Sequence, residues 1–225
     1  WLMKLNIWRS ESPHSVLLNG ADQEIFFPSE GDGWNKKRPL RLVTHHWGGN
    51  RLKGFDVYDH IDRLLDDSEW SSKIEFTYIG NLPKGYKFKN VNHIKPLTGK
   101  DLADHIRKND VYLTASINEP AGFHHIEGAC CGLPLLYRNS GALPEYCEGF
   151  GVEFDGVSDI EEKLNIMMHS YEELSKKMPK YPNTSINRTP EFVRLFELLY
   201  SNRKKVSNSR KLWRNPFMLI LNVFL

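Results

Sequence analysis

The chain has 225 residues, which is enough for one large domain or for one and a half small ones. Its 40% apolar and 26% charged residues are typical of a soluble globular protein and exclude a disordered or fibrous one. The 30 Lys and Arg residues against 28 Asp and Glu leave a net charge of +2, which does not support nucleic-acid binding.

Residues 1–39 differ from the rest of the chain. Val16 to Leu18 is predicted as a short apolar strand ended by Asn19-Gly20, and 31–38 is polar and rich in glycine. The chain starts at Trp1 without an initiator methionine, so we expect further residues upstream. We therefore predict that 1–39 is the end of a missing N-terminal domain together with the connection that leads into an α/β unit.

From about Leu40 onward, short β-branched runs alternate with helical patterns, as βαβ units around a parallel sheet require. The predicted strands are Arg41–His46, Ile74–Ile79, Val91–Lys95, Val111–Ala115, Pro134–Tyr137 and Val152–Phe154. Apolar stripes at helical spacing, interpreted as core faces, run over Val57–Leu65, Phe123–Leu133 and Ile160–Met168, and over Phe192–Leu199 after Pro190 at a helix start position. Residues 40–200 are therefore predicted to form an α/β domain with a doubly wound, Rossmann-like parallel sheet.

The last stretch, 201–225, combines basic and apolar residues. Its cations are Arg203, Lys204, Lys205, Arg210, Lys211 and Arg214. The apolar run that follows, 217–225, is shorter than the ~20 residues that span a bilayer. This tail is an interfacial anchor, a surface that packs on another domain, or a disordered end. We favour domain packing or disorder, with peripheral membrane contact as the alternative.

Ligands bind outside the carboxyl ends of the strands in an open α/β sheet, so the loops at that edge are the expected site. After the first predicted strand, Gly48 and Gly49 precede Arg51 and Lys53 at the start of a helix. Glycines allow a backbone to approach a phosphate closely, and helix amides with a cation complement its charge. The alternative is that the Gly-Gly pair only forms a tight turn.

A second loop, after the fourth predicted strand, runs from Asn118 to Glu127. The free amides of Ala121 to His124, at the start of the predicted helix, form a second anion site. Along a helix axis, at ~1.5 Å per residue, Glu119 and Glu127 lie about 12 Å apart, more than the roughly 5 to 9.5 Å that glycoside hydrolases use. The two acids therefore suit opposite ends of an elongated ligand, such as two sugars flanking a pyrophosphate. Alternatively, Glu119 only stabilises the helix terminus and Glu127 is a solvated surface residue.

The histidines near these loops allow two interpretations. His124 and His125 with Glu127 match no zinc motif, so we expect no bound metal. His45 and His46 end a predicted strand at the edge of the site, where they either contact a ligand or are structural residues with satisfied hydrogen bonds.

The cysteines show neither metal-ligand spacing nor a disulfide framework. Cys130 and Cys131 lie between small residues in a predicted helix, which favours buried packing over nucleophilic catalysis. Together with Cys147, they indicate a reducing, cytoplasmic compartment, or a peripheral position at its membrane if the tail binds lipid.

The stretch EPAGFHHIEGACCGLPLLYRNSGALPEYC, from Glu119 to Cys147, resembles glycosyltransferase family 4, whose retaining enzymes use nucleotide-sugar donors. It holds the two glutamates Glu119 and Glu127 with seven residues between them. Supporting matches are VLLNGADQEIFFP at Val16–Pro28 and Lys53-Gly54 after the first predicted strand. The resemblance covers about residues 16–200 and implies the C-terminal, donor-binding half of a GT-B fold.

The resemblance implies a role for each of the main site residues. It implies that Glu119 contacts the donor sugar and assists catalysis electrostatically. It also implies that Glu127 holds the ribose hydroxyls and that Lys53 neutralises the pyrophosphate of a UDP- or GDP-sugar. The donor is a substrate, and neither a cofactor nor a metal is expected.

Further contacts implied by the resemblance come from backbone and loop residues. The amides around Ala121, Gly122 and Phe123 contact phosphate or sugar, and the loop at Leu97 borders the base. Members of the family often carry an Arg five residues before the Lys, where this chain has Gly48. Arg51 is the candidate substitute.

The acceptor contacts in such enzymes come from an N-terminal α/β domain, which is the expected partner of this chain. One alternative is a domain that binds a nucleotide-sugar without turnover. Another is a GT-B-like nucleotide-sugar epimerase, which would need its own catalytic acids. An interaction domain of the response-regulator type would need clustered Asp residues at strand ends, which the sequence does not have. The donor sugar, the base and the acceptor are left open.

Overall fold

The computed structural model describes residues 16–31 and 33–205. The chain divides into two compact units, 1–188 and 189–225, and the second is described only as far as residue 205. From position 206 on, the predicted basic and apolar tail lies outside the described residues. None of the described helices combines the length and the apolar character that crossing a bilayer requires.

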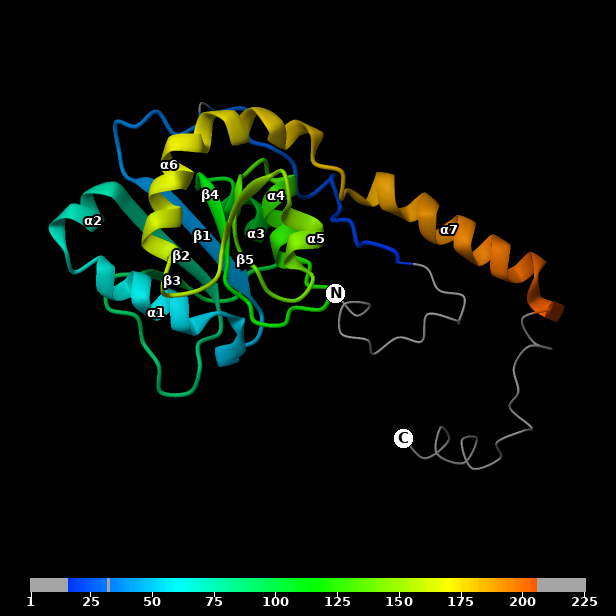
Figure 1. Cartoon of the computed structure of the whole chain (residues 1–225), viewed down its shortest axis with the longest axis horizontal. Coiled ribbons are helices and arrows are strands. Elements are labelled where there is room, and N and C mark those ends of the chain that lie inside the picture. The colour runs from blue at the N-terminus through cyan, green and yellow to red at the C-terminus, as the bar shows by residue number, and fades with distance from the viewer. Residues whose placement is uncertain (1–15, 32, 206–225) are drawn as a thin grey trace. The chain divides into compact units, whose positions relative to one another are not determined.

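From Leu40 onward the first unit mostly alternates strands and helices, except that the second and third strands follow each other without a helix between them (Figure 1). Its strands are β1 (Leu40–His46), β2 (Ile74–Gly80), β3 (Asn92–Ile94), β4 (Val111–Thr114), β5 (Leu135–Arg138) and β6 (Gly151–Phe154). Its helices are α1 (Phe55–Leu64), α2 (Ser68–Lys73), α3 (Gly99–Ile106), α4 (His124–Cys130), α5 (Leu143–Cys147) and α6 (Ile160–Lys177). Short 3₁₀ turns are η1 (Arg51–Lys53) and η2 (Met178–Lys180). A further helix, α7 (Ser185–Ser201), continues into the second unit.

The strands form one 6-stranded parallel sheet in the order β3-β2-β1-β4-β5-β6. The chain builds the sheet outward from β1 to β3 and then returns to the centre, where β4 starts the other half. The order therefore reverses between β1 and β4, where Leu42 pairs with Val111 and Val43 pairs with Tyr112. This is the doubly wound arrangement, and it confirms the predicted Rossmann-like fold. Each of the six strands predicted after Leu40 overlaps a strand of the sheet.

Helices cover both faces of the sheet, and each face has its own apolar core. Val43 and Tyr112 belong to the core that α3, α4 and α5 cover, while Leu42 and Leu113 belong to the core that α1, α2 and α6 cover. Neighbouring residues of a strand thus serve opposite faces, as the two-residue period of a strand requires. Burial on both faces explains why the central strands β4 and β5 are mostly apolar instead of alternating.

Two predicted elements differ from the structure. Val16–Leu18 is not a strand, because no strand among the described residues pairs with it, and the nearby pairing is a single bridge between Ala21 and Thr184. Pro190 does not start a helix, because α7 already begins at Ser185 and contains Pro190. The backbone carbonyl of Thr184 accepts a hydrogen bond from the Arg188 amide (3.0 Å), so the first turn forms before the proline is reached.

The segment before β1 is joined to the segment after α6 by backbone hydrogen bonds. The Ala21 amide donates to the Asn183 carbonyl (3.1 Å), and the Ser185 amide donates to the Ala21 carbonyl (2.8 Å). The two segments are so close that a Cβ on Gly20 would lie 2.4 Å from the Thr184 oxygen. Only glycine fits at this position.

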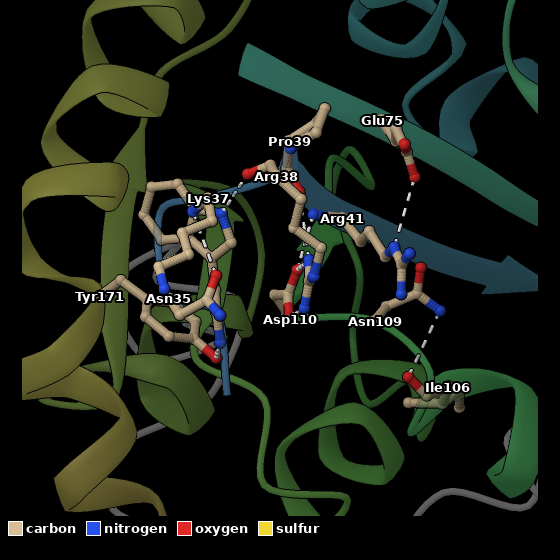
Figure 2. Close-up of polar contacts among 11 residues, drawn as sticks. Asn35, Lys37, Arg38, Pro39, Arg41, Glu75, Ile106, Asn109, Asp110 and Tyr171 are labelled. Atoms are coloured by element: carbon tan, nitrogen blue, oxygen red, sulfur yellow. Dashed lines mark hydrogen bonds and ion pairs between the residues drawn. The ribbon is translucent and has the colours of Figure 1, made fainter. Parts of the chain in front are cut away.

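An ion pair joins the amino ends of β1 and β4 (Figure 2). Arg38 makes two hydrogen bonds to the Asp110 carboxylate, at 2.5 and 2.8 Å, and the Arg41 amide donates to the same carboxylate at 2.8 Å. The pairing raises the pKa of Arg38, and the Asp110 side chain is only 4% exposed. The Trp34 indole donates to the Arg38 carbonyl (2.7 Å), and the Trp34 amide donates to the Tyr171 hydroxyl (3.1 Å), so the same segment is tied to α6.

We expect the substitution Asp110→Ala to lower the free energy of unfolding by about 2 to 3 kcal/mol, because it leaves a partly buried guanidinium and the Arg41 amide without their acceptor. The matched control is Glu75→Ala, which removes the exposed partner of the Arg41 side chain (3.4 Å) and should change stability by less than about 0.5 kcal/mol. Denaturant unfolding measures both, and equal effects of the two substitutions would contradict this assignment.

Candidate functional site at the carboxyl edge of the sheet

The loops that follow β1 and β4 meet at the carboxyl edge of the sheet. The Lys53 ammonium lies 2.7 Å from Oε2 of Glu119, in an ion pair whose side chains are 32% and 8% exposed. Glu119 is therefore a buried acid held by a partly accessible cation. The two main residues of the predicted pyrophosphate and sugar contacts lie side by side.

Local structure positions Lys53. The Asn50 side chain caps η1 by accepting a hydrogen bond from the Leu52 amide (2.9 Å), which places Lys53 in the last position of this turn. Gly54 follows with φ 101°, a left-handed conformation that favours glycine. A Cβ at Gly54 would lie 2.4 Å from Cβ of Ala115, so a glycine here also lets the loop pack closely against the end of β4.

Backbone contacts hold the loop that carries Glu119. The Glu119 carbonyl accepts from the Ala142 amide (2.8 Å), and Ser140 Oγ accepts from the Asn118 amide (2.8 Å). The loop after β5 thus joins the loop after β4, as the predicted cluster at this edge requires. Helix α4 begins only at His124, so the separation of about 12 Å reckoned along a helix axis does not describe Glu119 and Glu127.

Glu127 is also bound by a side chain from β1. Its Oε2 lies 2.7 Å from Nε2 of His45, and Nδ1 of His45 lies 2.9 Å from the Tyr112 hydroxyl on β4. The Glu127 side chain is 20% exposed. The interpretation of Glu127 as a solvated surface residue is therefore wrong, because a histidine holds its carboxylate.

Glu127 borders a cavity of about 330 Å³. The other lining residues come from the ends of β1 and β2, the start of α3 with the loop before it, and the segment 25–26. They are Ile25, Phe26, His45, His46, Trp47, Ile79, Pro96, Leu97, Thr98, Gly99 and Leu102. The cavity thus contains two of the predicted site residues, Leu97 and Glu127. Its wall is mostly apolar, with the carboxylate as its charged group.

The remaining predicted residues lie outside the cavity. Ala121 and Phe123 are exposed and Gly122 is half-buried, and their amides make no hydrogen bond to any residue that the structure describes. A Cβ on Gly122 would lie 2.9 Å from the Glu119 carboxyl carbon, so this loop passes directly over the acid. The Arg51 side chain is exposed and makes no hydrogen bond or ion pair to the described residues, so the structure does not join it to Lys53 and Glu119.

Three buried histidines surround these acids. His46 Nε2 lies 2.9 Å from the Tyr58 hydroxyl, and His124 Nε2 lies 2.8 Å from Thr114 Oγ1. His125 is 1% exposed, and neither of its ring nitrogens has a hydrogen-bond partner among the described residues. Burial lowers the pKa of all three imidazoles, and that of His125 falls to about 3. The three rings are therefore neutral at pH 7.

The buried His125 should make the fold sensitive to acid. The pKa of His125 in the folded chain, about 3, lies below the ordinary value of 6.5. From pH 6.5 downward, the unfolded chain therefore binds a proton at this residue, whereas the folded chain does not. We expect this residue alone to cost about 2 kcal/mol of stability between pH 7.5 and pH 5. Unfolding by urea across this pH range should show a smaller loss for His125→Phe than for the unsubstituted chain. If the free energy of unfolding falls equally with pH in both chains, His125 is protonated in the folded chain as readily as in the unfolded one.

No group of three or more potential metal-ligating side chains occurs among the described residues, and the absence of a metal stays a prediction. Cys130 and Cys131 are buried, and burial raises the pKa of both thiols to about 12. A thiolate is therefore strongly disfavoured at either position, in agreement with the predicted packing role.

A second hollow, of about 400 Å³, lies at the opposite edge of the sheet beside Arg38 and Arg107. Its arginines already have partners. Arg38 is held by Asp110, and Arg107 by Asp104 and the Ile25 carbonyl. The carboxyl edge remains the candidate site, because it offers accessible groups where ligands of such sheets bind.

Sequence reasoning missed two features of the site. Tyr112 gives no signal in the sequence, because it looks like any other buried strand residue until its pairing with β1 is known. The pairing of His45 with Glu127 joins positions far apart in the chain, although His45 stands at the end of a predicted strand.

The chain was compared with protein families, curated proteins and solved structures. No protein-family model matches the chain. Among curated proteins, the chain is 26% identical over 167 residues to the phosphatidylinositol N-acetylglucosaminyltransferase GPI3 subunit of two Saccharomyces cerevisiae strains, RM11-1a and ATCC 204508 / S288c. The match covers 67% of this chain and 36% of the yeast subunit, so the chain spans about a third of its length.

Solved glycosyltransferase structures share the fold, and two of them serve as examples. Sucrose-phosphate synthase of Thermosynechococcus elongatus superposes with a TM-score of 0.62 at 16% identity, covering 88% of this chain and 56% of that one. The C-terminal domain of a group 1 glycosyl transferase (LpcC) from Francisella tularensis superposes with a TM-score of 0.54 at 18% identity. This match covers 72% of this chain and 94% of that domain. The described chain thus has the Rossmann-like fold of the C-terminal half of GT-B glycosyltransferases.

Proposed function

We propose that the chain is the donor-binding domain of a retaining glycosyltransferase of family 4, which takes a UDP- or GDP-sugar. The observation that carries the proposal is the meeting of Lys53 and Glu119 at 2.7 Å, below a loop with free amides and beside a cavity that Glu127 borders. The fold shared with glycosyltransferase structures and the match to the yeast transferase subunit support it.

Lys53 and the amides of Ala121 to Phe123 would bind the pyrophosphate. An ammonium and backbone amides can balance this charge where water is excluded, without a divalent ion. Because the neighbouring imidazoles are neutral at pH 7, Lys53 supplies the positive charge of this part of the site. Arg51 is exposed on the same loop and is proposed as a second, weaker phosphate contact.

The ion pair suggests how donor binding could prepare Glu119. A pyrophosphate would compete for the Lys53 ammonium and leave the Glu119 carboxylate free to accept hydrogen bonds from the donor sugar. A buried carboxylate next to the sugar also stabilises positive charge that develops at the anomeric carbon during transfer. Both effects act on the sugar and not on the nucleotide.

The nucleoside would occupy the cavity. Its volume of about 330 Å³ is at the lower end of ligand pockets, which suits a nucleoside better than a whole donor. Glu127 would accept hydrogen bonds from the ribose hydroxyls, and the apolar wall at Leu97 would border the base.

The acceptor half of the site would come from a further α/β domain. The chain covers 56% of the synthase structure and 36% of the yeast subunit, which supports a longer parent protein. Helix α7 has no buried side chain and exposes Val193, Phe196 and Leu199. We propose that this apolar side packs on that domain.

The first test is metal-free binding. Titration calorimetry of the chain with UDP and with GDP should show binding that is the same in EDTA and in magnesium, because protein groups balance the pyrophosphate. Lys53→Met should weaken this binding by about tenfold or more, equivalent to at least ~1.4 kcal/mol. Binding that EDTA abolishes would refute the metal-free site.

The second test separates the two glutamates. Glu127→Ala should weaken binding of the free nucleotide by about 1.5 to 3 kcal/mol, the value of hydrogen bonds to a charged group. Glu119→Ala should leave free UDP or GDP binding as it is or strengthen it, since Lys53 loses a competitor, and should weaken only the nucleotide-sugar. If Glu119→Ala weakens the binding of the free nucleotide and of the nucleotide-sugar equally, Glu119 does not act on the sugar alone.

A further inference from the structure

His45 joins the charged wall of the cavity to the centre of the sheet. It lies at the end of β1, its Nε2 is 2.7 Å from Glu127 Oε2, and its Nδ1 is 2.9 Å from the Tyr112 hydroxyl. The Tyr112 oxygen also accepts a hydrogen bond from the His45 backbone amide (3.0 Å). The imidazole is therefore fixed at both nitrogens.

These contacts determine where the His45 proton lies. An ionised carboxylate only accepts hydrogen bonds, so Nε2, which faces Glu127, must carry a hydrogen. At the other nitrogen, Nδ1 either accepts the hydroxyl hydrogen of Tyr112 or donates to the Tyr112 oxygen, and the Nε2 hydrogen faces Glu127 in both cases. The hydrogen bond between His45 and Glu127 thus runs from the ring nitrogen to the carboxylate.

The arrangement leaves one carboxylate oxygen of Glu127 for a ligand. Oε2 is held by His45, whereas Oε1 makes no hydrogen bond to any described residue. The carboxylate terminus of a glutamate rotates easily when nothing holds it, because its last torsion is broad. With Oε2 held, Oε1 keeps a constant direction at the wall of the cavity.

We infer that His45 is a positioning residue for recognition of a vicinal diol: through Glu127 it makes the site select nucleotides that carry both ribose hydroxyls. The inference rests on the proposed function, because it assigns the cavity to the nucleoside. His45 itself does not touch the ribose and acts through Glu127. The ring of His124 lies 6.3 Å from that of His45, measured between centroids, and its Nε2 lies 2.8 Å from Thr114 Oγ1, so this nitrogen is engaged away from the Glu127 carboxylate.

The test compares ribonucleotides with analogues that lack the diol. The experiment is calorimetry of the chain with UDP, GDP and their 2′,3′-dideoxy counterparts. His45→Phe should weaken the binding of the ribonucleotide about tenfold, the equivalent of one charge-assisted hydrogen bond. Binding of the dideoxy analogue should not change. His45→Gln should restore ribonucleotide binding, because its amide can donate to Glu127 from a similar position. In a Glu127→Ala background, His45→Phe should have no further effect.

A spectroscopic readout is independent of the ligand. Nitrogen-15 NMR of the imidazoles at pH 7 should show His45 protonated at Nε2, and a ring protonated only at Nδ1 would overturn the inference. Equal losses for ribose and dideoxy nucleotides in His45→Phe, or no loss at all, would overturn it too, while leaving the proposed function in place. If the unsubstituted chain binds neither UDP nor GDP, the proposed function fails, and the inference fails with it.

Discussion

The pairing of β1 with β4 at the centre of the sheet is the constraint on which the site depends. These two strands begin the two halves of the fold, and the loops that follow them turn to opposite faces. Between such loops a crevice must form at the carboxyl edge. Lys53 comes from one loop and Glu119 from the other, and the Arg38 to Asp110 pair holds the opposite ends of the same two strands.

Charge is distributed sparingly within this site. Among the described residues, Glu119 and Glu127 each have a single side-chain partner of complementary chemistry. Burial keeps His46, His124 and His125 neutral at pH 7. A charge buried without a partner is costly, so each of these carboxylates is held by a side chain that can donate to it. In the proposed function, an anionic donor that displaced Lys53 from Glu119 would change this charge balance and so couple donor binding to the freeing of the Glu119 carboxylate.

Much of the fold is predictable from sequence, because an apolar run buried on both faces is a local signal. Val16–Leu18 shows the limit, since an apolar run becomes a strand only when a neighbour pairs with it. The site divides similarly. Loops at one sheet edge can be placed together, so Lys53 and Glu119 could be expected near each other. The contact of His45 with Glu127 depends on strand register and on the direction of α4, which no short stretch of sequence encodes.

The backbone bonds that join Ala21 to Asn183 and Ser185 bring the start and the end of the α/β unit to one point. A linker between two ends that lie this close can be short, and the entropy cost of closing a loop grows with its length. The unit therefore has the geometry of an insertable module: it could be placed within a surface loop of another protein, or circularly permuted by a short linker near Gly20, without disturbing the sheet. New chain ends would be tolerated best in exposed loops far from β1 and β4.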